Sequence, residues 1–468
     1  MHDLERLFNP RSIAVVGSKK IDNHTWLRTI LPFQGPKYNV NVDTSEWESA
    51  EELGFSSYKS VTELPGEIDY VIVSVPAKVV PLVLKDCIEK GVYAVHLYTA
   101  GYGETGTELG SQLEEELETL AKNSGIKLVG PNCIGLFNPN IGVGMNLGGY
   151  QSSSGRFGFI SHSGSQSSGV TRTAWAQGLI ASKVISMGNG LILDTPDYLD
   201  YFSQDENTSV IGMYVEGVRN GKKFFNALKE VCKKKPVLVW KVGETEEAGA
   251  VVEGHSTSKA TRPEVWDAML RQCGAIKVDN MESLLETTKL LLHLPNTTGK
   301  RLGLLALSGG HSTEMANVFS KAGFQIPQLS EHSYTRILEH WDVVGSTYRN
   351  PLEGRTLSNP INMNNVLDVL NEDDDIDIIV QEISIGQPKD GSIPVFRGHD
   401  AGIFCQFKER AKKPYIIVIS NVLSQSDPVD IDTVYQQILA AGIPAGFGFK
   451  ATADALNRVI THFKYQSE

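Results

Sequence analysis

Short runs of apolar, often β-branched residues recur along the chain and are separated by stretches with helical spacing. In the first third of the chain these runs lie at residues 12–17, 70–76, 93–101 and 126–132. Buried parallel strands are continuous apolar runs of this kind, because both faces of the sheet are covered. The pattern therefore predicts a parallel sheet with helical connections, and the loops after its strands are the expected place for a ligand.

Two further series of such runs follow the first. After a Gly/Ser-rich joint at 148–156, the second series has runs at 157–165, 182–190, 209–217, 235–243 and 275–278. After a helix expected at 281–293 and a polar hinge at 294–300, the third series has runs at 301–310, 375–386, 414–420 and 443–449. We expect three α/β domains with parallel sheets, at 1–150, 151–295 and 300–468.

Composition narrows the classes of function. The 468 residues are 41% hydrophobic and 21% charged, which fits a globular protein of about three domains. The net charge of -12 disfavours general attraction to nucleic acid or to an anionic membrane surface. The five cysteines are widely spaced and form no C-x-x-C, so we expect neither a disulfide framework nor a metal site. This cysteine usage fits a reducing cytoplasm best. Because no apolar run is long enough to span a bilayer, we expect neither export nor a membrane anchor.

Small and amide residues stand at the ends of the four strands predicted in the first segment. No G-x-G-x-x-G motif develops after Gly17 and Ser18, which argues against an NAD enzyme. Loops of this kind expose backbone N–H groups and let a nucleotide lie close to the sheet. Each loop alone is more simply explained as a tight turn, but four such loops on one edge of the sheet raise the case for a shared ligand. The candidate contacts are Gly17, Ser18, Val75, Pro76, Ala77, Thr99, Ala100, Gly101, Pro131 and Asn132.

A second candidate site follows the run at 157–165. Its strand, Ser/Gly loop and helix start can hold a phosphate at Ser163, Gly164 and Ser165, although a helix cap without a ligand has the same pattern. The segment 241–260 is expected to be a long polar loop with one histidine, His255. A neutral imidazole there can attack a phosphoryl group if a carboxylate holds its other nitrogen, and Glu216 is the candidate for that role. By composition alone, a merely solvated histidine is the simpler reading.

Taken in order, these motifs resemble those of the CoA-binding alpha subunits of NDP-forming acyl-CoA synthetases, relatives of succinyl-CoA synthetase. The landmarks are RSIAVVGS, VIVSVPA, AGYGE, GPNCIG, FISHSG, SMGN, YVEG and the histidine segment that begins at Lys241. LALSGGHST and RNPLEG resemble the third domain of the longer alpha subunits, so the resemblance covers essentially the whole chain.

This resemblance implies both a fold and an activity. The fold is a Rossmann-like CoA-binding domain followed by two flavodoxin-like parallel-sheet domains. The activity is that of an acid–CoA ligase, which makes acyl-CoA from a small organic acid through a phosphohistidine. His255 would carry the phosphoryl group, Glu216 would orient it, the Ser163 loop would bind the phosphate, and the first-domain loops would bind CoA.

The resemblance also implies a partner. The chain shows no ATP-grasp domain, which in this family binds ATP or GTP with Mg²⁺. A separate ATP-grasp beta subunit and a hetero-oligomer are therefore expected.

Two other functions stay open at this point. One is a non-catalytic CoA-binding sensor or scaffold. The other is a carbamoyl-transferring relative of the same fold, which the presence of both His255 and Glu216 disfavours.

Other histidines compete for a role in the site. The sequence G-H-S-T occurs at 254–257 and again at 310–313, so His311 is a rival ligand for a phosphoryl group or anion. The family usually has S-H-T-G-S at the first of these places, so the glycine has changed sides. His162 lies inside the predicted phosphate loop and is a further candidate for substrate contact.

Overall fold

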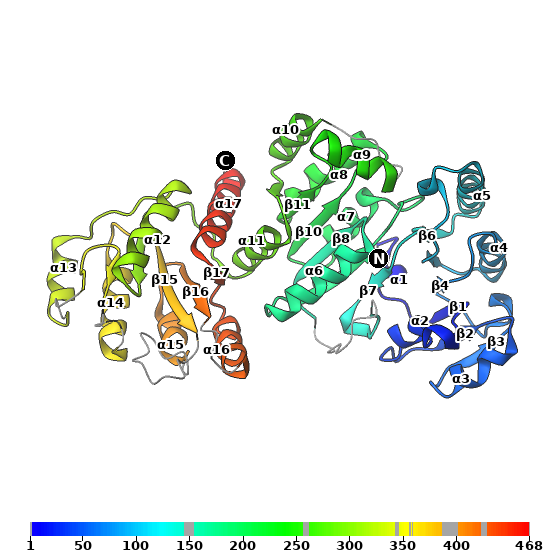
Figure 1. The fold of residues 1–468 in the computed structure, drawn as a ribbon, viewed down its shortest axis with the longest axis horizontal. Helices are drawn as coiled ribbons and strands as arrows, with labels where there is room; N and C mark the ends of the chain where they lie inside the picture. The colour runs from blue at the N-terminus through cyan, green and yellow to red at the C-terminus, as the bar shows by residue number, and fades with distance from the viewer. Residues whose placement is uncertain are drawn as a thin grey trace. The chain divides into compact units, whose positions relative to one another are not determined.

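The computed structural model describes residues 2–144, 154–255, 262–341, 346–354, 357, 359–385, 401–422 and 428–467. Within them, the side chains of residues 250, 253–255, 421–422 and 428–432 are not described. The chain divides into two compact units, Met1–Met281 and Glu282–Glu468 (Figure 1). The first unit contains two sheets and the second contains one, so each sheet corresponds to one of the three predicted series of strands.

The first sheet is entirely parallel and has the strand order β3-β2-β1-β4-β5-β6. This order reverses between β1 and β4, as in the Rossmann-like fold that was predicted. The connections leave such a switch point in opposite directions and open a crevice at the carboxyl ends of the strands. The strands are β1 (Ile13–Val16), β2 (Lys37–Val40), β3 (Ser56–Tyr58), β4 (Tyr70–Val73), β5 (Ala94–Leu97) and β6 (Lys127–Val129). The helices are α1 (Glu5–Phe8), α2 (Thr25–Thr29), α3 (Trp47–Glu51), α4 (Val80–Lys90) and α5 (Glu108–Ser124).

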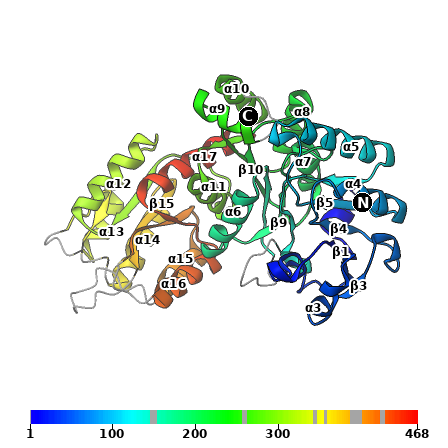
Figure 2. The same ribbon diagram turned by 45° about the vertical axis from the view of Figure 1, so that its right-hand side comes forward.

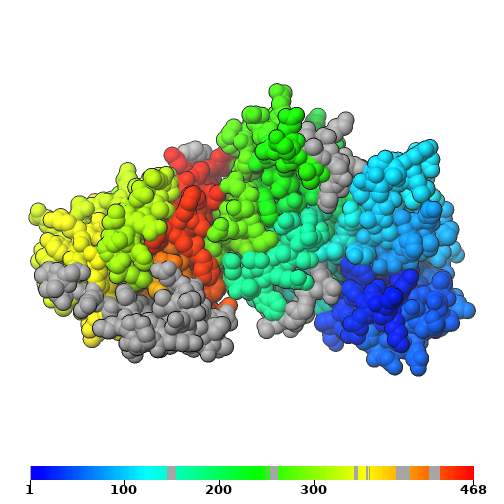
Figure 3. Space-filling model, in the orientation of Figure 1, coloured from blue at the N-terminus to red at the C-terminus, as the bar shows by residue number. Residues whose placement is uncertain are grey.

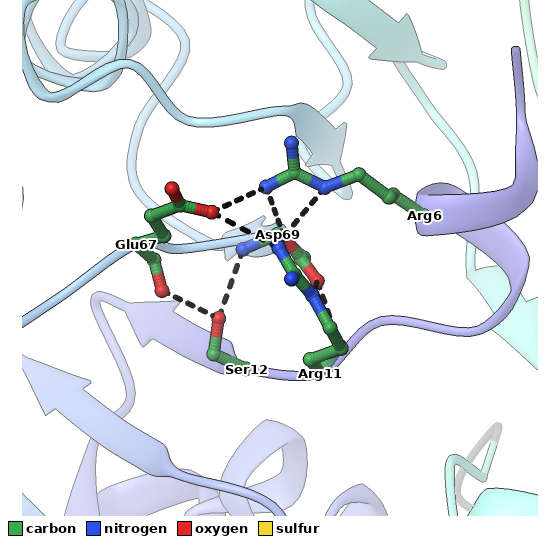
Figure 4. A network of polar contacts seen from close by, with 5 residues as sticks. All are labelled: Arg6, Arg11, Ser12, Glu67 and Asp69. Carbon is green, nitrogen blue, oxygen red and sulfur yellow. Dashed lines mark hydrogen bonds and ion pairs between the residues drawn. The ribbon is translucent and has the colours of Figure 1, made fainter.

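The amino ends of β1 and β4 are joined by a charged network (Figure 4). The carboxylate of Asp69 has no solvent exposure and accepts hydrogen bonds from Nε of Arg6 at 2.8 Å and Nε of Arg11 at 2.8 Å. The N–H of Asp69 donates to the hydroxyl of Ser12 at 3.0 Å, and that hydroxyl donates to the carbonyl of Glu67 at 2.8 Å. Burial raises the pKa of Asp69, but the arginine contacts outweigh burial and hold it at about 2. This network holds together the amino ends of β1 and β4, and the ligand loops lie at the opposite, carboxyl ends of the strands.

The second sheet has the order β12-β11-β10-β8-β9-β7, in which β7 alone is antiparallel. The order reverses between β8 and β10, as in flavodoxin-like folds. The strands are β7 (Gly135–Phe137), β8 (Phe157–Ser161), β9 (Ala181–Ser186), β10 (Val210–Val215), β11 (Val237–Lys241) and β12 (Ile276–Val278). The helices are α6 (Gly164–Ala176), α7 (Thr195–Gln204), α8 (Gly221–Cys232), α9 (Glu246–His255) and α10 (Pro263–Cys273).

Helix α9 corrects one expectation from the sequence. The segment 241–260 was expected to be a polar loop, but residues Glu246–His255 form a helix. Glu246 and Glu247 stand in its first turn, where acidic residues favour the helix dipole, and Val252 is buried. Residues 256–260 lie outside the described residues.

The sheet of the second unit is parallel throughout, with the order β14-β13-β15-β16-β17. The order reverses between β13 and β15, so this domain is also flavodoxin-like, as predicted. The strands are β13 (Leu302–Ala306), β14 (Leu352–Glu353), β15 (Ile378–Ile385), β16 (Tyr415–Val422) and β17 (Ala445–Phe447). The helices are α11 (Met281–His293), α12 (Gly309–Lys321), α13 (Glu331–Leu338), α14 (Pro360–Glu372), α15 (Gly402–Arg410), α16 (Pro428–Ala440) and α17 (Phe449–Ser467).

Two apolar cores lie on the two faces of this sheet (Figure 2). Residues of α11, α12 and α17 form one core with alternate residues of the strands, including Val380. Residues of α13, α14, α15 and α16 form the other core with the intervening residues, including Ile379. Both faces of the strands are therefore covered, which explains their continuous apolar runs.

The predicted domain limits at 1–150, 151–295 and 300–468 remain predictions. Among the described residues, no helix combines the length and apolar character needed to cross a bilayer.

Candidate functional site

The loops after β1, β4, β5 and β6 lie side by side because these four parallel strands are neighbours in the first sheet. Gly17 follows β1 with φ of +89°, a conformation that favours glycine. A Cβ at Gly17 would lie 2.5 Å from the carbonyl oxygen of Ser74 and 2.5 Å from Cγ1 of Val75. Only glycine therefore lets the β1 loop pack against the β4 loop at the switch point.

The hydroxyl of Ser18 is buried and helps to hold the loop after β1. Its Oγ lies 3.0 Å from Nδ1 of His24, and Nε2 of His24 lies 2.7 Å from Oγ of Ser49. The carbonyl of Ser18 accepts a hydrogen bond from Nδ2 of Asn41 at 2.8 Å. The Ser18 side chain therefore shapes this loop from within.

Contacts among the other predicted residues join their loops into one surface. The hydroxyl of Thr99 donates to the carbonyl of Val75 at 2.6 Å, and the N–H of Asn132 donates to the carbonyl of Thr99 at 3.1 Å. A Cβ at Gly101 would lie 3.3 Å from Cβ of Ala77. The structure thus brings the predicted loops together, with Pro76 and Ala100 exposed and Pro131 buried.

Exposed apolar side chains follow the strands at the same edge. Ile21 lies after β1 and is 93% exposed, Val42 lies after β2 and is 83% exposed, and Tyr98 lies after β5 and is 45% exposed. Isolated exposed apolar residues need no explanation, but several at the ligand edge of one sheet suit a partly apolar ligand.

Two residues that the sequence analysis did not assign connect the first two sheets. The carboxylate of Glu104 accepts hydrogen bonds from the N–H of Gly101 at 2.6 Å and from Nδ2 of Asn189 at 2.6 Å. The N–H of Asn189 donates to the carbonyl of Pro131 at 3.0 Å. Burial raises the pKa of Glu104, but the hydrogen bonds outweigh burial and lower it below its usual value. Both residues stand in motifs, AGYGE and SMGN, that had been recognised without a role for these side chains.

The first turn of α6 has the expected geometry for an anion. Ser163 is its N-cap, and the hydroxyl of Ser163 accepts a hydrogen bond from the N–H of Gln166 at 3.3 Å. The same hydroxyl lies 3.0 Å from that of Ser165. A Cβ at Gly164 would lie 3.1 Å from Cγ2 of Ile134, so this turn packs tightly against the chain after β6. Because this turn is the N-terminus of α6, the positive end of the helix dipole favours an anion there.

Charged groups gather beside that turn, at the switch point of the second sheet. β8 and β10 are paired, with Ser161 opposite Tyr214, so the residues that follow them are close. Nδ1 of His162 lies 3.3 Å from the carbonyl of Tyr214. Glu216 follows β10 and is buried, and its carbonyl accepts a hydrogen bond from Nζ of Lys241 at 3.0 Å. The structure thus brings Glu216 and His162 to the predicted phosphate turn.

Burial dominates the electrostatics of this cluster. Burial lowers the pKa of His162, while the carboxylates of Asp194 and Glu216 oppose this shift. Burial also lowers the pKa of Lys241, against the influence of Glu244 and Glu216. His162 is therefore held toward its neutral form, in which it can accept or donate one hydrogen bond at each nitrogen.

His255 is the last residue of α9, and its side chain lies outside the described side chains. Two contacts hold the start of this helix against the second sheet and against the loop that precedes it. Glu244 precedes α9 and pairs with Lys277, with 2.7 Å between Oε1 and Nζ. A Cβ at Gly243 would lie 2.9 Å from Cγ2 of Val252 in α9. The contact between His255 and Glu216 stays a prediction.

Comparison with known protein families identifies the two domains of the first unit. Residues 11–139 match a CoA binding domain, and residues 154–291 match the succinyl-CoA ligase like flavodoxin domain. The fold and these two family matches therefore define a protein of the succinyl-CoA ligase class, with a Rossmann-like CoA-binding domain followed by flavodoxin-like domains.

Several curated relatives and one solved structure specify the family. The chain is 31% identical over 382 residues to subunit alpha of acetate–CoA ligase [ADP-forming] II from Pyrococcus furiosus, with 81% of each chain covered. It is 33% identical over 381 residues to acetate–CoA ligase [ADP-forming] I from Archaeoglobus fulgidus, which covers 81% of this chain and 54% of the relative. An acetyl-coenzyme A synthetase from Ca. Korarchaeum cryptofilum, solved with phosphate and ADP, has a TM-score of 0.85 at 26% identity and covers 100% of this chain and 98% of its own.

The chain belongs to the ADP-forming acyl-CoA synthetase family, in which it aligns with the alpha subunits. It spans about half the length of the A. fulgidus relative and about four fifths of the P. furiosus subunit, as the coverages of 54% and 81% state.

Proposed function

We propose that this chain is the alpha subunit of an ADP- or GDP-forming acid–CoA ligase. The reaction converts a small organic acid, CoA and a nucleoside triphosphate to acyl-CoA, the nucleoside diphosphate and phosphate. The observation that carries the proposal is the switch point of the second sheet, where the Ser163 turn after β8 and Glu216 after β10 stand together beside His162. Family membership supports the same reaction class, because relatives are named acetate and 4-hydroxybutyrate CoA ligases.

CoA is proposed to lie along the carboxyl edge of the first sheet. The residues there fit such a ligand, because Gly17 lets the backbone of two loops approach closely and Ile21, Val42 and Tyr98 offer exposed apolar surface. Backbone N–H groups suit the phosphates, and the apolar side chains suit the adenine and pantetheine parts. The predicted contacts from Gly17 to Asn132 form one edge, which supports a single extended ligand.

His255 is proposed to carry the phosphoryl group between the nucleotide and the acid. On transfer to the acid, the N–P bond breaks and a P–O bond to the carboxylate forms, which gives an acyl phosphate. The thioester then forms by attack of a thiol on the acyl carbon, with phosphate as the leaving group. Glu216 would hold the second ring nitrogen of His255, and the N–H groups of the Ser163 turn would hold the phosphate oxygens.

The nucleotide site is proposed to lie on a partner. Relatives named subunit alpha support the need for a second subunit. An ATP-grasp beta subunit that binds ATP or GTP with Mg²⁺ would supply the phosphoryl group, and the complex would be a hetero-oligomer in the cytoplasm.

Transfer of radioactive phosphate tests this function. The chain is mixed with its beta subunit, Mg²⁺ and γ-³²P-labelled ATP, and acid-labile label is measured. Acetate and CoA are then added, and acetyl-CoA formation is measured. We expect label on the alpha chain, and we expect His255→Ala to abolish both label and thioester. His340→Ala removes an exposed histidine at the end of α13 and should leave both unchanged.

The other outcomes separate the alternatives. CoA binding without label in any mixture would contradict the ligase and support a CoA-binding sensor. Thioester formation that survives His255→Ala would contradict the proposed phosphohistidine. Carbamoyl transfer without label would support the carbamoyl-transferring relative.

A further inference from the structure

The switch point of the third sheet carries a second pair of a histidine and a buried carboxylate. β13 leads through Ser308 into α12, and His311 is the third residue of that helix. Nδ1 of His311 lies 2.6 Å from Oε1 of Glu382. The Glu382 side chain has 0% exposure, whereas the His311 side chain keeps 34%. One ring nitrogen of His311 therefore faces a buried carboxylate while part of the ring remains in contact with solvent.

The position of Glu382 follows from the register of the sheet. Leu305 in β13 pairs with Gln381 in β15, so Glu382 stands level with Ala306, the last residue of β13. The other oxygen of Glu382, Oε2, accepts a hydrogen bond from the N–H of Leu307 at 2.8 Å. The carboxylate is thus fixed by the backbone at the point where the chain leaves β13, directly below the turn that carries His311.

The turn itself leaves room for a ligand. A Cβ at Gly310 would meet no heavy atom within 4 Å, and a Cβ at Gly309 would meet only the Glu353 carboxylate, at 3.6 Å. Glu353 pairs with Ala306 from the β14 side, so it is the second carboxylate in the same row of the sheet. Helix α12, yellow-green in Figure 3, lies at the surface of its unit. The His311 side chain keeps 34% exposure, so small molecules can reach it.

We infer that His311 is a second phosphoryl-accepting histidine of this chain, with Glu382 as its positioning residue. A carboxylate oxygen 2.6 Å from Nδ1 favours the tautomer with the proton on Nδ1, which leaves the Nε2 lone pair as the nucleophile. The same carboxylate balances the positive charge that the ring gains when phosphorus binds Nε2. The first turn of α12 adds a helix N-terminus, which favours the incoming anion.

The proposed function supplies a phosphoryl donor for His311, the acyl phosphate. From an acyl phosphate, the P–O bond to the acyl group breaks, the carboxylate leaves with the electron pair, and an N–P bond forms at Nε2. Nδ1 keeps its proton, and the Glu382 carboxylate, 2.6 Å from Nδ1, balances the charge of the ring. This assignment rests on the proposed function for its biological donor, but the reactivity of His311 itself does not depend on it.

Two phosphoryl donors test the assignment on the full chain. Acetyl [³²P]phosphate transfers its phosphoryl group with acetate as the leaving group, and phosphoramidate transfers a phosphoryl group to imidazole with ammonia as the leaving group. The His255→Asn variant is treated with each donor at neutral pH, and phosphorylated histidines are located by mass spectrometry. We expect label at His311 at least tenfold above that at His332, an exposed histidine of α13 in the same unit. His311→Asn should remove this label.

Glu382 and Glu353, the two carboxylates on either side of Ala306 in the sheet, provide matched variants. Glu382→Gln keeps an oxygen for the Leu307 N–H but removes the charge that balances the phosphorylated ring, so the rate of labelling should fall at least tenfold. Glu353→Gln removes a negative charge on the other side of the turn, so labelling should equal or exceed that of the parent chain. Circular dichroism and thermal melting confirm that each variant is folded.

Each outcome has one meaning. Label at His311 no higher than at His332 with phosphoramidate, in a folded chain, would overturn the assignment. Equal loss of label in Glu382→Gln and Glu353→Gln would overturn the role of Glu382. Absence of label on His255 in the parent chain with acetyl phosphate, together with no thioester, would instead contradict the proposed function, whatever happens at His311.

Discussion

Nδ2 of Asn189 donates a hydrogen bond of 2.6 Å to the carboxylate of Glu104, and this bond ties the ligand edge of the first sheet to the second sheet. The other oxygen of Glu104 accepts the N–H groups of Gly101 and Tyr102, so the carboxylate fixes the loop after β5 at the same time. The proposed CoA site and the proposed phosphate site are thereby held in one compact unit.

Loss of this charge should weaken both the loop and the ligand site. Glu104→Gln keeps the size of the side chain but weakens charge-assisted hydrogen bonds, so we expect a loss of about 1–2 kcal/mol in the free energy of unfolding. We also expect the dissociation constant for CoA to rise by about tenfold, measured by isothermal titration calorimetry. Glu115→Gln, at an exposed position in the middle of α5, is the control and should change neither quantity.

Asp69 predicts a pH dependence of stability. Because its folded pKa of about 2 lies below the unfolded value of about 3.9, its ionisation stabilises the fold above pH 4, by about 2 kcal/mol. This contribution is lost as pH falls through the folded pKa. Asp69→Asn should therefore lose about 2 kcal/mol at pH 7, and the difference from the parent chain should be roughly halved near pH 3. Urea unfolding at several pH values measures the difference in free energy of unfolding between the two chains. A difference that stays constant with pH would contradict the prediction.

The close contacts around Gly17 predict that alanine is more destabilising there than at a glycine with free space around it. Both Gly17 and Gly66 have positive φ, at +89° and +67°, but a Cβ at Gly66 would meet nothing within 4 Å. Gly66→Ala should cost about 1 kcal/mol of stability from φ alone, whereas Gly17→Ala should cost about 2–4 kcal/mol and abolish CoA binding. Thermal melts and CoA titration compare the two variants, and equal effects would show that the two loops do not need this close approach.

Ser163 predicts a separation of stability from function. Ser163→Ala and Thr107→Ala each remove an N-cap hydroxyl, so each should cost about 1 kcal/mol. Only Ser163→Ala should also slow phosphoryl transfer, by about tenfold, because only α6 is proposed to hold the phosphate. Rates of label transfer with the beta subunit measure this difference. If both variants transfer label at the same rate, the α6 turn is a structural cap alone.

The strands were predictable where both faces of the sheet are buried. The runs at 12–17 and 70–76 contain β1 and β4, whose four residues are all buried. The strands β2 and β3 lie toward the outer edge of the same sheet and are short, polar and partly exposed, so no apolar run marked them. Helix α9 was missed because its small residues and acidic start resemble a loop when its packing is unknown.

The site was predictable in its parts but not in its connections. Ser163 and Glu216 follow apolar runs, so local patterns made them candidates, and the resemblance to a known family then assigned them roles in one reaction. The partnership of Glu104 with Asn189 joins residues 85 positions apart, and that of His311 with Glu382 joins residues 71 positions apart. Local patterns carry no information on which distant strands become neighbours.

The sequence alone determined the three series of buried strands, the family and the places where ligand loops begin, because burial on two faces and turn chemistry are local requirements. The tertiary structure decided which of those loops share an edge of the sheet and which carboxylate faces which histidine. It also decided that the Ser18 hydroxyl is hydrogen-bonded within its own loop. The physical reason is that strand order and register bring together residues from distant parts of the chain, and the close contacts between them exist only after the sheets have formed.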